Sequence, residues 1–537
     1  MKNLTYQLVI AYLLLGLLCA TASAQLLRKV ALEGDPAPGT PIGSTFTRFG
    51  IFGPIGTTGA ALNAAGHTAF YAETTSGGGT GIWSEGFGAL ELVARTTTGA
   101  PGTPDGTNFN GFKEPLLNSA GQTAFLGTLP GSTDRTPNYG IWSEGSGTLG
   151  LVAREGTQAP GTPDGVNFGD LRIPVFNSAG QTAFRGFLTG AGVDSTNSSG
   201  IWSEGSGSLT LIARAGDQAN GAPSGVNFTG FRDPVLNSLG QTAFEGFTSV
   251  GVGIWSERSG TLELVTHTGD SAPGMPFGVN FNGFETPVFN SAGNTAFIGS
   301  LTGNGVESEN NESIWSEGSG PLTLVAREGD QAPGLPSGVN FGDFSTDFNR
   351  PVLNSAGQSA FLADLVGSDV DNRNARSVWS EGTGTLALVA RAGERAPGTP
   401  AGVKFGSFQN LVLNSAGQTA FMGHLSGSGV DSLNNSGIWA EDRAGVLKLI
   451  VREGDQLEVA PGDSRTIKFL VEFIGDSGND DGRISGFNDL GQLAFRAAFA
   501  DNSSGIFVSN LATLPEPHSL LLLASAAVSS LLRVRSR

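Results

Sequence analysis

The chain has 537 residues, a formal net charge of −18, 15% charged residues, 39% hydrophobic residues, 82 glycines and 26 prolines. Such acidity opposes binding to nucleic-acid phosphates, and abundant glycine disfavours long helices. The composition therefore argues against nucleic acid as a partner and favours an all-β protein, whose length indicates several repeated cores rather than one.

Residues 1–24 have the pattern of a secretory signal peptide. Lys2 precedes an apolar stretch that ends in Ala22-Ser23-Ala24, a signal-peptidase site, so we expect cleavage before Gln25. The single cysteine of the chain, Cys19, lies in this segment. The mature protein is thus predicted to be exported and to have no disulfide, cysteine nucleophile or cysteine metal ligand.

An octapeptide, NSAGQTAF at Asn118–Phe125, marks a tandem repeat that fills the chain after this segment. A Gly-Ile-Trp-Ser-Glu motif, which contains the seven tryptophans in its variants, and a Leu-Val-Ala-Arg-Glu-Gly-Asp-Gln-Ala-Pro-Gly motif accompany it. The tryptophans are 53 to 64 residues apart, a period typical of repeat folds. The eight copies of the octapeptide begin at Asn63, Asn118, Asn177, Asn237, Asn290, Asn354, Asn414 and Asn488.

Each unit is predicted to contain four strands. The first has the form Phe-x-x-Pro-Val-Leu-Asn, as at Phe231–Asn237, and the others contain the Gln-Thr-Ala-Phe, Gly-Ile-Trp and Leu-Val-Ala motifs. In Asn-Ser-Ala-Gly, Asn can hydrogen-bond its own turn and Gly can adopt a positive φ, so the octapeptide is interpreted as a tight hairpin turn plus the start of the second strand. Adjacent apolar residues such as Ala124-Phe125 indicate sheets covered on both faces.

Eight four-stranded antiparallel units predict an eight-bladed β-propeller at residues 25–512. The first strand of the chain, Leu27–Asp35, has the sequence of a fourth strand, whereas the last unit ends after its third strand at Gly505–Asn510. We therefore expect the N-terminal strand to complete the eighth blade and to cover two strand edges. The main alternative is a β-helix, whose turns are much shorter than this period.

The repeat also resembles known families. The order Pro-Val-Leu-Asn-Ser-Ala-Gly-Gln-Thr-Ala-Phe, Gly-Ile-Trp, Leu-Val-Ala resembles TolB-type propeller blades, although Ala or Leu stands where that motif has Asp before Gly. More closely, the eight copies of Asn-x-x-Gly-x-x-Ala-Phe resemble the NxxGxxAF tandem-repeat family of exported bacterial proteins, which carry one of several surface-anchoring tails. That resemblance covers nearly the whole mature chain, and it implies no particular activity.

The C-terminal segment, residues 513–537, has three parts in order: Pro515-Glu516-Pro517, an uncharged run at residues 519–532 that we expect to be helical, and terminal arginines. The run is short for a membrane span. This order resembles the PEP-CTERM sorting signal, which exosortase-like transpeptidases recognise in Gram-negative bacteria. The resemblance implies a processing signal with membrane contact and a body that ends at the cell surface, the outer envelope or the extracellular matrix. A simple C-terminal membrane tail is the alternative.

Four units share a long loop between the second and third strands, in which an acid is followed three residues later by Asn. The acids are Asp194, Glu307, Asp371 and Asp431. In a propeller these loops share a face with the acid-bearing inter-blade loops, and Ca²⁺ takes about six to eight oxygen ligands. The four acids are therefore candidate Ca²⁺ ligands, with solvated Asx turns as the competing interpretation.

Catalytic patterns are not evident in the sequence. It has no metal-ligand spacing, nucleophile elbow or phosphate loop, and its four histidines occupy unrelated places. The repetition of Trp-Ser-Glu points to packing and turn roles. Repeated arginines that end the fourth strand are expected to pair with nearby Glu and Asp; they are Arg95, Arg154, Arg214, Arg327, Arg391 and Arg452.

These observations predict a non-catalytic, exported surface- or matrix-associated protein that acts as a binding or structural module. Signal peptidase and an exosortase-like transpeptidase are its expected processing partners, and polysaccharides or surface proteins are its expected ligands. No cofactor other than Ca²⁺ is expected. The alternative is a secreted hydrolase or lyase with its site in the central channel. Such an enzyme should have unlike charged residues where first strands break the repeat, as at Lys113-Glu114, Arg232-Asp233 or Arg350.

Overall fold

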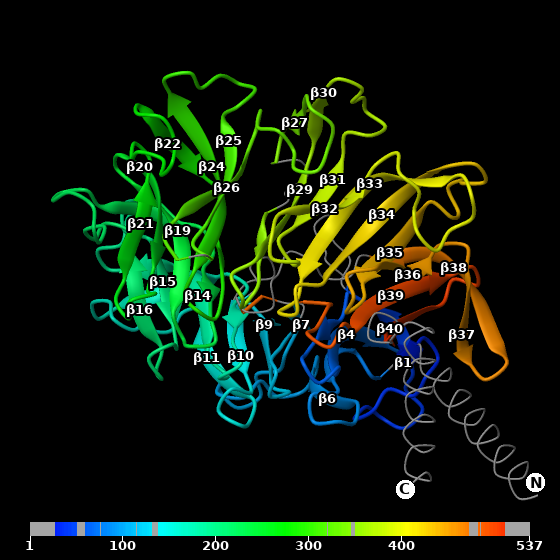
Figure 1. Cartoon of the computed structure of the whole chain (residues 1–537). Coiled ribbons are helices and arrows are strands. Elements are labelled where there is room, and N and C mark those ends of the chain that lie inside the picture. The colour runs from blue at the N-terminus through cyan, green and yellow to red at the C-terminus, as the bar shows by residue number, and fades with distance from the viewer. Residues whose placement is uncertain are drawn as a thin grey trace, which may run out of the picture.

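The computed structural model describes residues 27–50, 59–75, 77–113, 115–131, 138–318, 320–344, 350–471, 482–483 and 485–510. These residues form forty strands and no helix. The strands make antiparallel sheets arranged around a common centre (Figure 1), so the predicted all-β, eight-bladed propeller is confirmed. The predicted signal peptide, with Ala24 and Gln25, and the C-terminal tail, with Pro515, Glu516 and Pro517, lie outside the described residues.

The first four blades follow one another along the chain. Blade 1 contains β2 (Phe46–Phe49), β3 (Ala61–Leu62), β4 (Thr68–Thr74), β5 (Thr80–Ser84) and β6 (Glu91–Arg95). Blade 2 contains β7 (Gly111–Phe112), β8 (Leu116–Leu117), β9 (Thr123–Leu129), β10 (Asn138–Ser143) and β11 (Gly150–Arg154). Blade 3 contains β12 (Val166–Leu171), β13 (Val175–Phe176), β14 (Thr182–Gly190), β15 (Ser199–Ser203) and β16 (Thr210–Arg214). Blade 4 contains β17 (Phe228–Phe231), β18 (Val235–Leu236), β19 (Thr242–Thr248), β20 (Gly251–Ser256) and β21 (Glu263–His267).

The last four blades continue the series. Blade 5 contains β22 (Val279–Phe284), β23 (Val288–Phe289), β24 (Thr295–Gly303), β25 (Glu312–Ser316) and β26 (Thr323–Arg327). Blade 6 contains β27 (Val339–Phe341), β28 (Val352–Leu353), β29 (Ser359–Ala363), β30 (Leu365–Gly367), β31 (Ser377–Ser380) and β32 (Ala387–Arg391). Blade 7 contains β33 (Val403–Leu413), β34 (Thr419–Gly427), β35 (Ser436–Glu441) and β36 (Leu447–Arg452). Blade 8 contains β37 (Gln456–Ala460), β38 (Asp463–Val471), β39 (Leu493–Phe499), β40 (Ser504–Ser509) and β1 (Leu27–Leu32).

The ring closes as the sequence predicts, because β1 is the outermost strand of blade 8. It pairs antiparallel with β40, with Leu27 opposite Ser509 and Leu32 opposite Gly505. Figure 1 shows this junction, where blue β1 lies beside red β40. The first and last described segments of the chain therefore share one sheet, and β1 covers an edge that β40 would otherwise expose.

The octapeptide forms the predicted hairpin turn. In blade 2 the N–H of Asn118 donates to the carbonyl of Gln122, and the N–H of Gly121 donates to the carbonyl of Asn118. Gly121 has a φ of +84°, a conformation that glycine adopts at no steric cost. The second strand follows at once, since β9 begins at Thr123.

The first strand differs from the prediction, which made it continuous from the Phe-x-x-Pro motif to Asn. In blade 4 it begins earlier, at β17, and breaks before β18, with Pro234 in the gap. Proline has no N–H to donate to a strand ladder. In blade 7, where Leu411 stands in place of the proline, β33 runs unbroken with local register shifts. The proline therefore causes the break that the pattern of apolar residues concealed.

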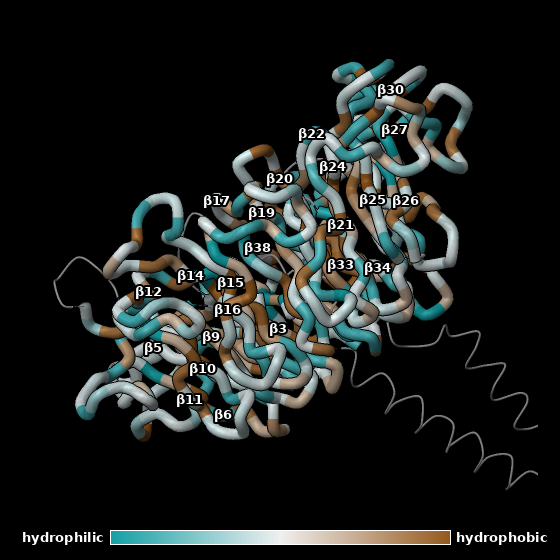
Figure 2. Tube along the Cα trace, turned by 90° about the vertical axis from the view of Figure 1, so that its left-hand side faces the viewer, coloured by the Kyte–Doolittle hydropathy of each residue, from teal (hydrophilic) through white to brown (hydrophobic). Residues whose placement is uncertain are grey.

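Each gap between blades is filled by aromatic side chains. Trp202 and Phe184 are fully buried and stack with ring centroids 6.3 Å apart, while Phe168 meets the indole edge-on at 4.9 Å. The same cluster includes Ile141 of the preceding blade. Figure 2 shows hydrophobic stretches along the strands and more hydrophilic ones in many of the loops. Burial on both sheet faces, as the adjacent apolar residues predict, thus holds blade against blade.

The residue two positions before each tryptophan decides how the indole is turned. In blade 3 this residue is Gly200, and the Trp202 Nε1 donates to the Pro160 carbonyl at 3.0 Å. In blades 5 and 6 it is serine, and Trp315 and Trp379 each donate to that serine hydroxyl at 2.8 Å instead. The sequence variation from Gly-Ile-Trp to Ser-Ile-Trp or Ser-Val-Trp therefore changes the hydrogen-bond partner of the indole.

We expect Gly200→Ala to destabilise the protein by about 1–3 kcal/mol, a typical cost of overpacking. A Cβ at this position would lie 2.8 Å from the Trp202 ring. Gly200→Ser should lose less stability, because the indole can turn to the new hydroxyl as Trp315 does. Equilibrium denaturation of both variants tests this, and an alanine variant as stable as the serine variant would contradict it.

The strand order gives the propeller two unlike faces. The turn face carries the octapeptide turns and the turns after Trp-Ser-Glu, as the bond from Gln122 Nε2 to the Glu144 carbonyl shows. The loop face carries the loops between second and third strands and the inter-blade loops, as the bond from Arg214 Nε to the Asn197 carbonyl shows. The predicted sharing of one face by these two sets of loops is therefore confirmed.

Charge is distributed unequally between these faces. Apart from the repeated glutamates, the turns of the turn face contain four charged residues, namely Arg258, Asp442, Arg443 and Asp489. Acids are much more frequent in the described loops of the loop face; they include Asp35, Asp105, Asp164, Asp194, Asp217, Asp270, Glu307, Glu309, Asp330, Asp369, Asp371, Asp431, Asp455 and Asp501. Most of the exposed acidity of the propeller thus belongs to one face.

Candidate functional site

Eight asparagines, one from each octapeptide, form a closed ring of hydrogen bonds between blades, which we call the asparagine ring. The side-chain Nδ2 of each donates to the backbone carbonyl of its equivalent in the next blade over 2.9–3.2 Å, and Asn488 closes the circle on Asn63. Each Oδ1 accepts N–H groups two and four residues further on, as Asn118 does from Ala120 and Gln122. The ring is buried, and so it stabilises the assembled circle of blades.

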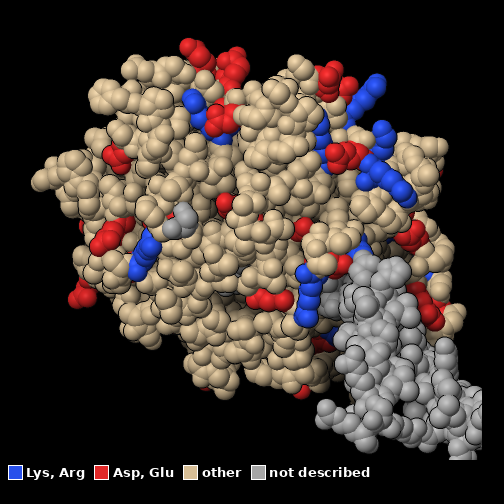
Figure 3. Space-filling view, viewed as in Figure 1, with Lys and Arg blue, Asp and Glu red and all other residues tan. Residues whose placement is uncertain are grey.

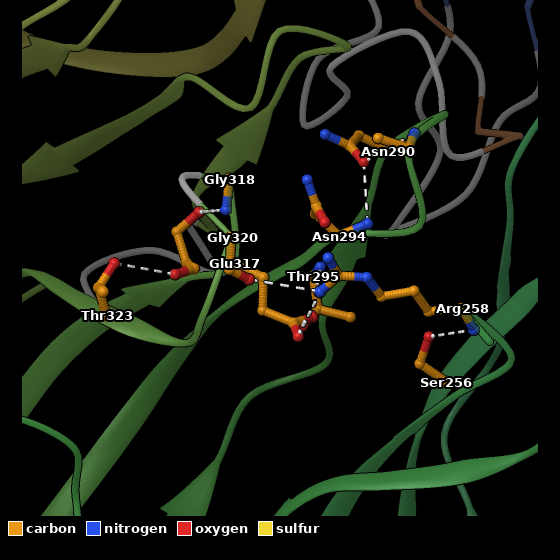
Figure 4. Close-up of polar contacts among 11 residues, drawn as sticks. Ser256, Arg258, Asn290, Asn294, Thr295, Glu317, Gly318, Gly320 and Thr323 are labelled. Atoms are coloured by element: carbon orange, nitrogen blue, oxygen red, sulfur yellow. Dashed lines mark hydrogen bonds and ion pairs between the residues drawn. The ribbon is translucent and has the colours of Figure 1, made fainter.

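The glutamate of each Trp-Ser-Glu motif fastens the third strand to the start of the second. Glu317 accepts the hydroxyl of Thr295 at 2.6 Å and its N–H at 3.0 Å, and Arg258 of the preceding blade lies 3.0 Å from the same carboxylate (Figure 4). Equivalent carboxylates bind the octapeptide Thr or Ser in six other blades. The repeated glutamates therefore have structural partners, in line with the predicted turn role.

The four candidate Ca²⁺ acids lie in four exposed loops, each in a different blade. Asp194 accepts the N–H of Thr196 at 2.8 Å and its hydroxyl at 2.6 Å, and these bonds lower the pKa of Asp194. Asp371 and Asp431 accept the N–H two residues further on in the same way. These three carboxylates therefore make the Asx turns of the competing interpretation.

Glu307 lies in a loop of the same geometry, but its carboxylate does not accept the N–H two residues further on as the three aspartates do. Its N–H donates to Asn310 Oδ1 at 2.9 Å, as in the other three loops. Over the described ranges, no three His, Cys, Asp or Glu side chains gather as a group that could hold a metal ion. Ca²⁺ binding stays a prediction, which titration calorimetry with millimolar calcium tests.

Four of the six repeated arginines bind the backbone of the long loops. In the four blades that have the long loop, the arginine Nε donates to the backbone carbonyl of the loop asparagine at 2.8–3.2 Å; the donors are Arg214, Arg327, Arg391 and Arg452. The sequence predicts that these arginines pair with nearby Glu and Asp, but in the structure the Nε atoms of these four donate to backbone carbonyls instead. Burial raises the pKa of Asp330 and Asp455, and the nearby Arg327 and Arg452 only partly oppose that rise.

Charged residues that depart from the repeat come together where the inner strands of blades 3, 4 and 5 meet. Arg185 Nε lies 2.8 Å from Asp233 Oδ1. Arg232 Nε lies 3.9 Å from Glu245 Oε2, which also accepts the hydroxyl of Thr286 at 3.3 Å. We call the four charged residues Arg185, Arg232, Asp233 and Glu245 the inner charged cluster. In the view of Figure 3, charged side chains are scattered over a largely uncharged surface.

Glu245 is the group in this cluster best placed to exchange a proton. Its side chain is 5% exposed, and burial raises its pKa, while the charges of Arg232 and Arg350 oppose the rise. The guanidinium of Arg232 also lies over the ring of Phe247, 5.7 Å from its centroid. Buried acids with raised pKa values are frequent in active sites, although structural ion networks produce them as well.

The sequence analysis identified part of this cluster. Arg232, Asp233 and Arg350 were named as exceptions to the repeat. The structure places the first two in the cluster and Arg350 near enough to Glu245 for its charge to oppose the rise of the pKa of Glu245, whereas Lys113 lies in blade 2 and Glu114 lies outside the described residues. Arg185 and Glu245 were missed. Their signal was the residue after Ala-Phe, which is Leu, Ile or Met in blades 2, 5, 6 and 7 and is charged in blades 3 and 4, as it also is in blade 8, where it is Arg496.

A cavity of about 280 Å³ lies at the axis on the turn face, and the octapeptide turns of several blades line it. The short inner strands lie side by side around this axis. A segment of blade 8 crosses here: the Gly482 carbonyl accepts the N–H of Phe176, and the Ser485 carbonyl accepts the N–H of Leu62, both at 2.8 Å. This segment therefore occupies part of the central channel.

Four glutamates at equivalent positions after the fourth strand are expected to make the stability of the protein depend on pH. Burial raises the pKa of Glu155 from 4.5 to about 7 and also raises the pKa values of Glu33, Glu328 and Glu453. A raised folded-state pKa means that the folded protein binds more protons, so stability present below the unfolded pKa is lost as the pH rises through the folded pKa.

We therefore expect the thermal midpoint to be higher at about pH 5 than at about pH 8. Glu155→Gln should flatten this dependence between pH 4.5 and about 7, because glutamine cannot titrate. Differential scanning calorimetry across this range is the measurement. Thr157→Ala, in the exposed loop that follows, is the control and should keep the wild-type profile.

The fold and the asparagine ring define the class of this protein: it is an eight-bladed β-propeller built from one tandem repeat. A family of unknown function, DUF7453, matches residues 16–347 and 345–521. The chain belongs to this family. None of the curated proteins compared with the sequence matches it. Within the described residues, no helix is long and apolar enough to cross a membrane.

Solved structures resemble the fold at low sequence identity. The β-propeller domain of the Trilobed protease from Pyrococcus furiosus is 9% identical with a TM-score of 0.40, and the match covers 75% of this chain and 94% of that one. An oligogalacturonate lyase in complex with manganese is 10% identical with a TM-score of 0.33, covering 78% and 99%. A puromycin hydrolase is 11% identical with a TM-score of 0.33, covering 82% and 58%.

Proposed function

We propose that this propeller is an exported, non-catalytic binding or structural module of the cell surface or extracellular matrix. Signal peptidase removes residues 1–24, and an exosortase-like transpeptidase processes the C-terminal tail through Pro515, Glu516 and Pro517. The motif order of the two ends supports this route, and the likeness to the NxxGxxAF repeat family agrees with it. The body then acts outside the inner membrane of a Gram-negative-type bacterium.

The observation that carries the non-catalytic role is the use of the repeated polar side chains. The asparagine ring joins the blades, the repeated glutamates hold Thr or Ser, and four of the six repeated arginines hold loop carbonyls. Each of these side chains makes the same structural bond in blade after blade, so the repeated polar groups are spread around the ring. Catalysis normally requires unlike groups that converge at one site. Polysaccharides and surface proteins are the ligands we propose for the loop face.

The test is a ligand array read for both binding and turnover. The purified propeller is incubated with polysaccharides and peptides, and bound ligand and released product are measured separately. We expect a ligand to be retained and recovered intact. Release of new reducing ends, unsaturated sugars or peptide fragments would contradict the proposal.

The inner charged cluster favours a second candidate, a hydrolase or lyase that acts at the inner strands. Glu245 would then transfer the proton, since it is the buried acid with a raised pKa, and Arg232 would neutralise an anionic group of the substrate. Any turnover on the array should in that case disappear in Glu245→Gln. Glu263→Gln, an exposed acid of the same blade, is the matched control and should keep the activity.

A further inference from the structure

Both described ends of the propeller lie on the turn face. Asn510, the last described residue, accepts a 2.6 Å hydrogen bond from Gln492 in the octapeptide of blade 8. At the other end, Leu27 is paired with Ser509, and Arg28 donates to the carbonyl of Gly66 in the octapeptide of blade 1. The chain therefore leaves the propeller toward its C-terminal tail from the turn face.

The tail is too short to reach round to the other face. Residues 511–518 separate Asn510 from the uncharged run, and eight extended residues span at most about 26–29 Å. Strand β14, nine residues long, runs from the turn face to the loop face and rises about 30 Å before either set of turns is added. An anchor at residues 519–532 can therefore sit under the turn face, whereas the loop face lies beyond its reach.

Charge favours the same arrangement. The exposed acids gather on the loop face, where Asp194, Asp371 and Asp431 are examples, and bacterial membranes carry negative charge that repels them. On the turn face three of the seven repeated glutamates are buried, namely Glu85, Glu317 and Glu441, and the other four are half-buried. A lipid surface therefore meets less exposed negative charge on the turn face.

From these observations we infer that the turn face lies against the membrane that holds the tail, and that the loop face points away from it toward ligands. This inference rests on the proposed function, because it takes the tail as the anchor. It assigns the two faces different partners: a lipid surface for the turns, and soluble or matrix ligands for the acidic loops.

Short-range fluorescence quenching tests the orientation. The mature chain, residues 25–537, lacks Cys19 and keeps its tail, and it is labelled at one new cysteine, either Ser206→Cys on the turn face or Ser195→Cys on the loop face. Both serines are exposed and belong to blade 3, so the pair differs in face alone. The protein is added to phosphatidylcholine vesicles containing phosphatidylglycerol and lipids with a nitroxide headgroup. We expect most emission to be lost at position 206 and none at position 195.

Vesicle flotation separates the failure of the orientation from that of the anchor. A protein that floats with vesicles but is quenched equally at both positions, or more at position 195, overturns the orientation and leaves the anchor intact. A protein that fails to float overturns both. A flexible insertion of about 20 Gly and Ser residues after Asn510 lengthens the tether, and it should weaken quenching at position 206 without abolishing flotation. Unchanged quenching in this variant would contradict the argument from reach.

Discussion

Deleting residues 27–32 is expected to destabilise the whole propeller by more than about 4 kcal/mol, since truncating one buried leucine alone costs about 2–5 kcal/mol. The deletion removes β1, in which Ala31 and Leu32 are 1% and 5% exposed. It also breaks the ion pair between Arg28 and Glu85, which joins blade 8 to blade 1. Circular dichroism during denaturation should show an earlier or broader transition.

Aggregation is the second expected effect of this deletion. Without β1, strand β40 presents unpaired N–H and C=O groups at the edge of blade 8, and such an edge can pair with another molecule. Size-exclusion chromatography should therefore show oligomers that the wild-type protein does not form. A monomeric deletion variant with the wild-type midpoint would contradict the role of β1 in closing the ring.

A circular permutant is the matched control for the deletion. It begins at Gly43 and carries residues 27–42 after Asn510, with the cut between exposed Ile42 and Gly43. Leu27 and Ser509 are opposite each other in the sheet, so a short hairpin linker of about 2–4 residues suffices. We expect this permutant to keep nearly all of the lost stability, because it restores β1 to its place by a local connection.

The closure was predictable because it depends on counting strands along the chain. A Leu-Val-Ala type strand stands before the first octapeptide and none follows the last third strand, so the partner of β40 could be named from sequence. The break in the first strand was not predicted. Arg232, Asp233 and Pro234 lie between β17 and β18, and the proline has no N–H to donate to the strand ladder.

The candidate site was less predictable because its bonds cross between blades. The sequence gives the turn in which an asparagine sits, but it does not state how near the next blade lies. One physical signal was available: Asp could accept the turn bonds of Asn118, yet all eight copies have Asn. Only the amide also supplies a donor, and that donor forms the asparagine ring. For Arg185 and Glu245 the signal was their charge at a position that is apolar in blades 2, 5, 6 and 7.

Asn237→Ala is expected to cost about 2–4 kcal/mol, since each buried group left without a partner costs about 1–3 kcal/mol. Asn237 is fully buried; its Oδ1 accepts the N–H groups of Leu239 and Gln241, and its Nδ2 donates to the Asn290 carbonyl. Leu239→Ala is the matched control, because it lies in the same turn with its side chain 67% exposed. Denaturant unfolding should place the control near wild type. Equal midpoints for the two variants would contradict the ring.

Asn237→Asp separates the bond between blades from the bonds within the turn. Aspartate keeps the oxygen that Leu239 and Gln241 use, but at neutral pH it sets a buried charge against the Asn290 carbonyl. Burial, together with the Asn290 carbonyl that faces the second carboxylate oxygen, raises the folded-state pKa above its unfolded value of about 3.9. The folded protein then binds the extra proton, so the variant should gain stability relative to wild type as the pH falls through that raised pKa. Protonation restores an O–H donor to the ring, whereas Asn237→Ala should show no such gain at any pH. Parallel pH profiles for the two variants would mean that the donor between blades contributes nothing.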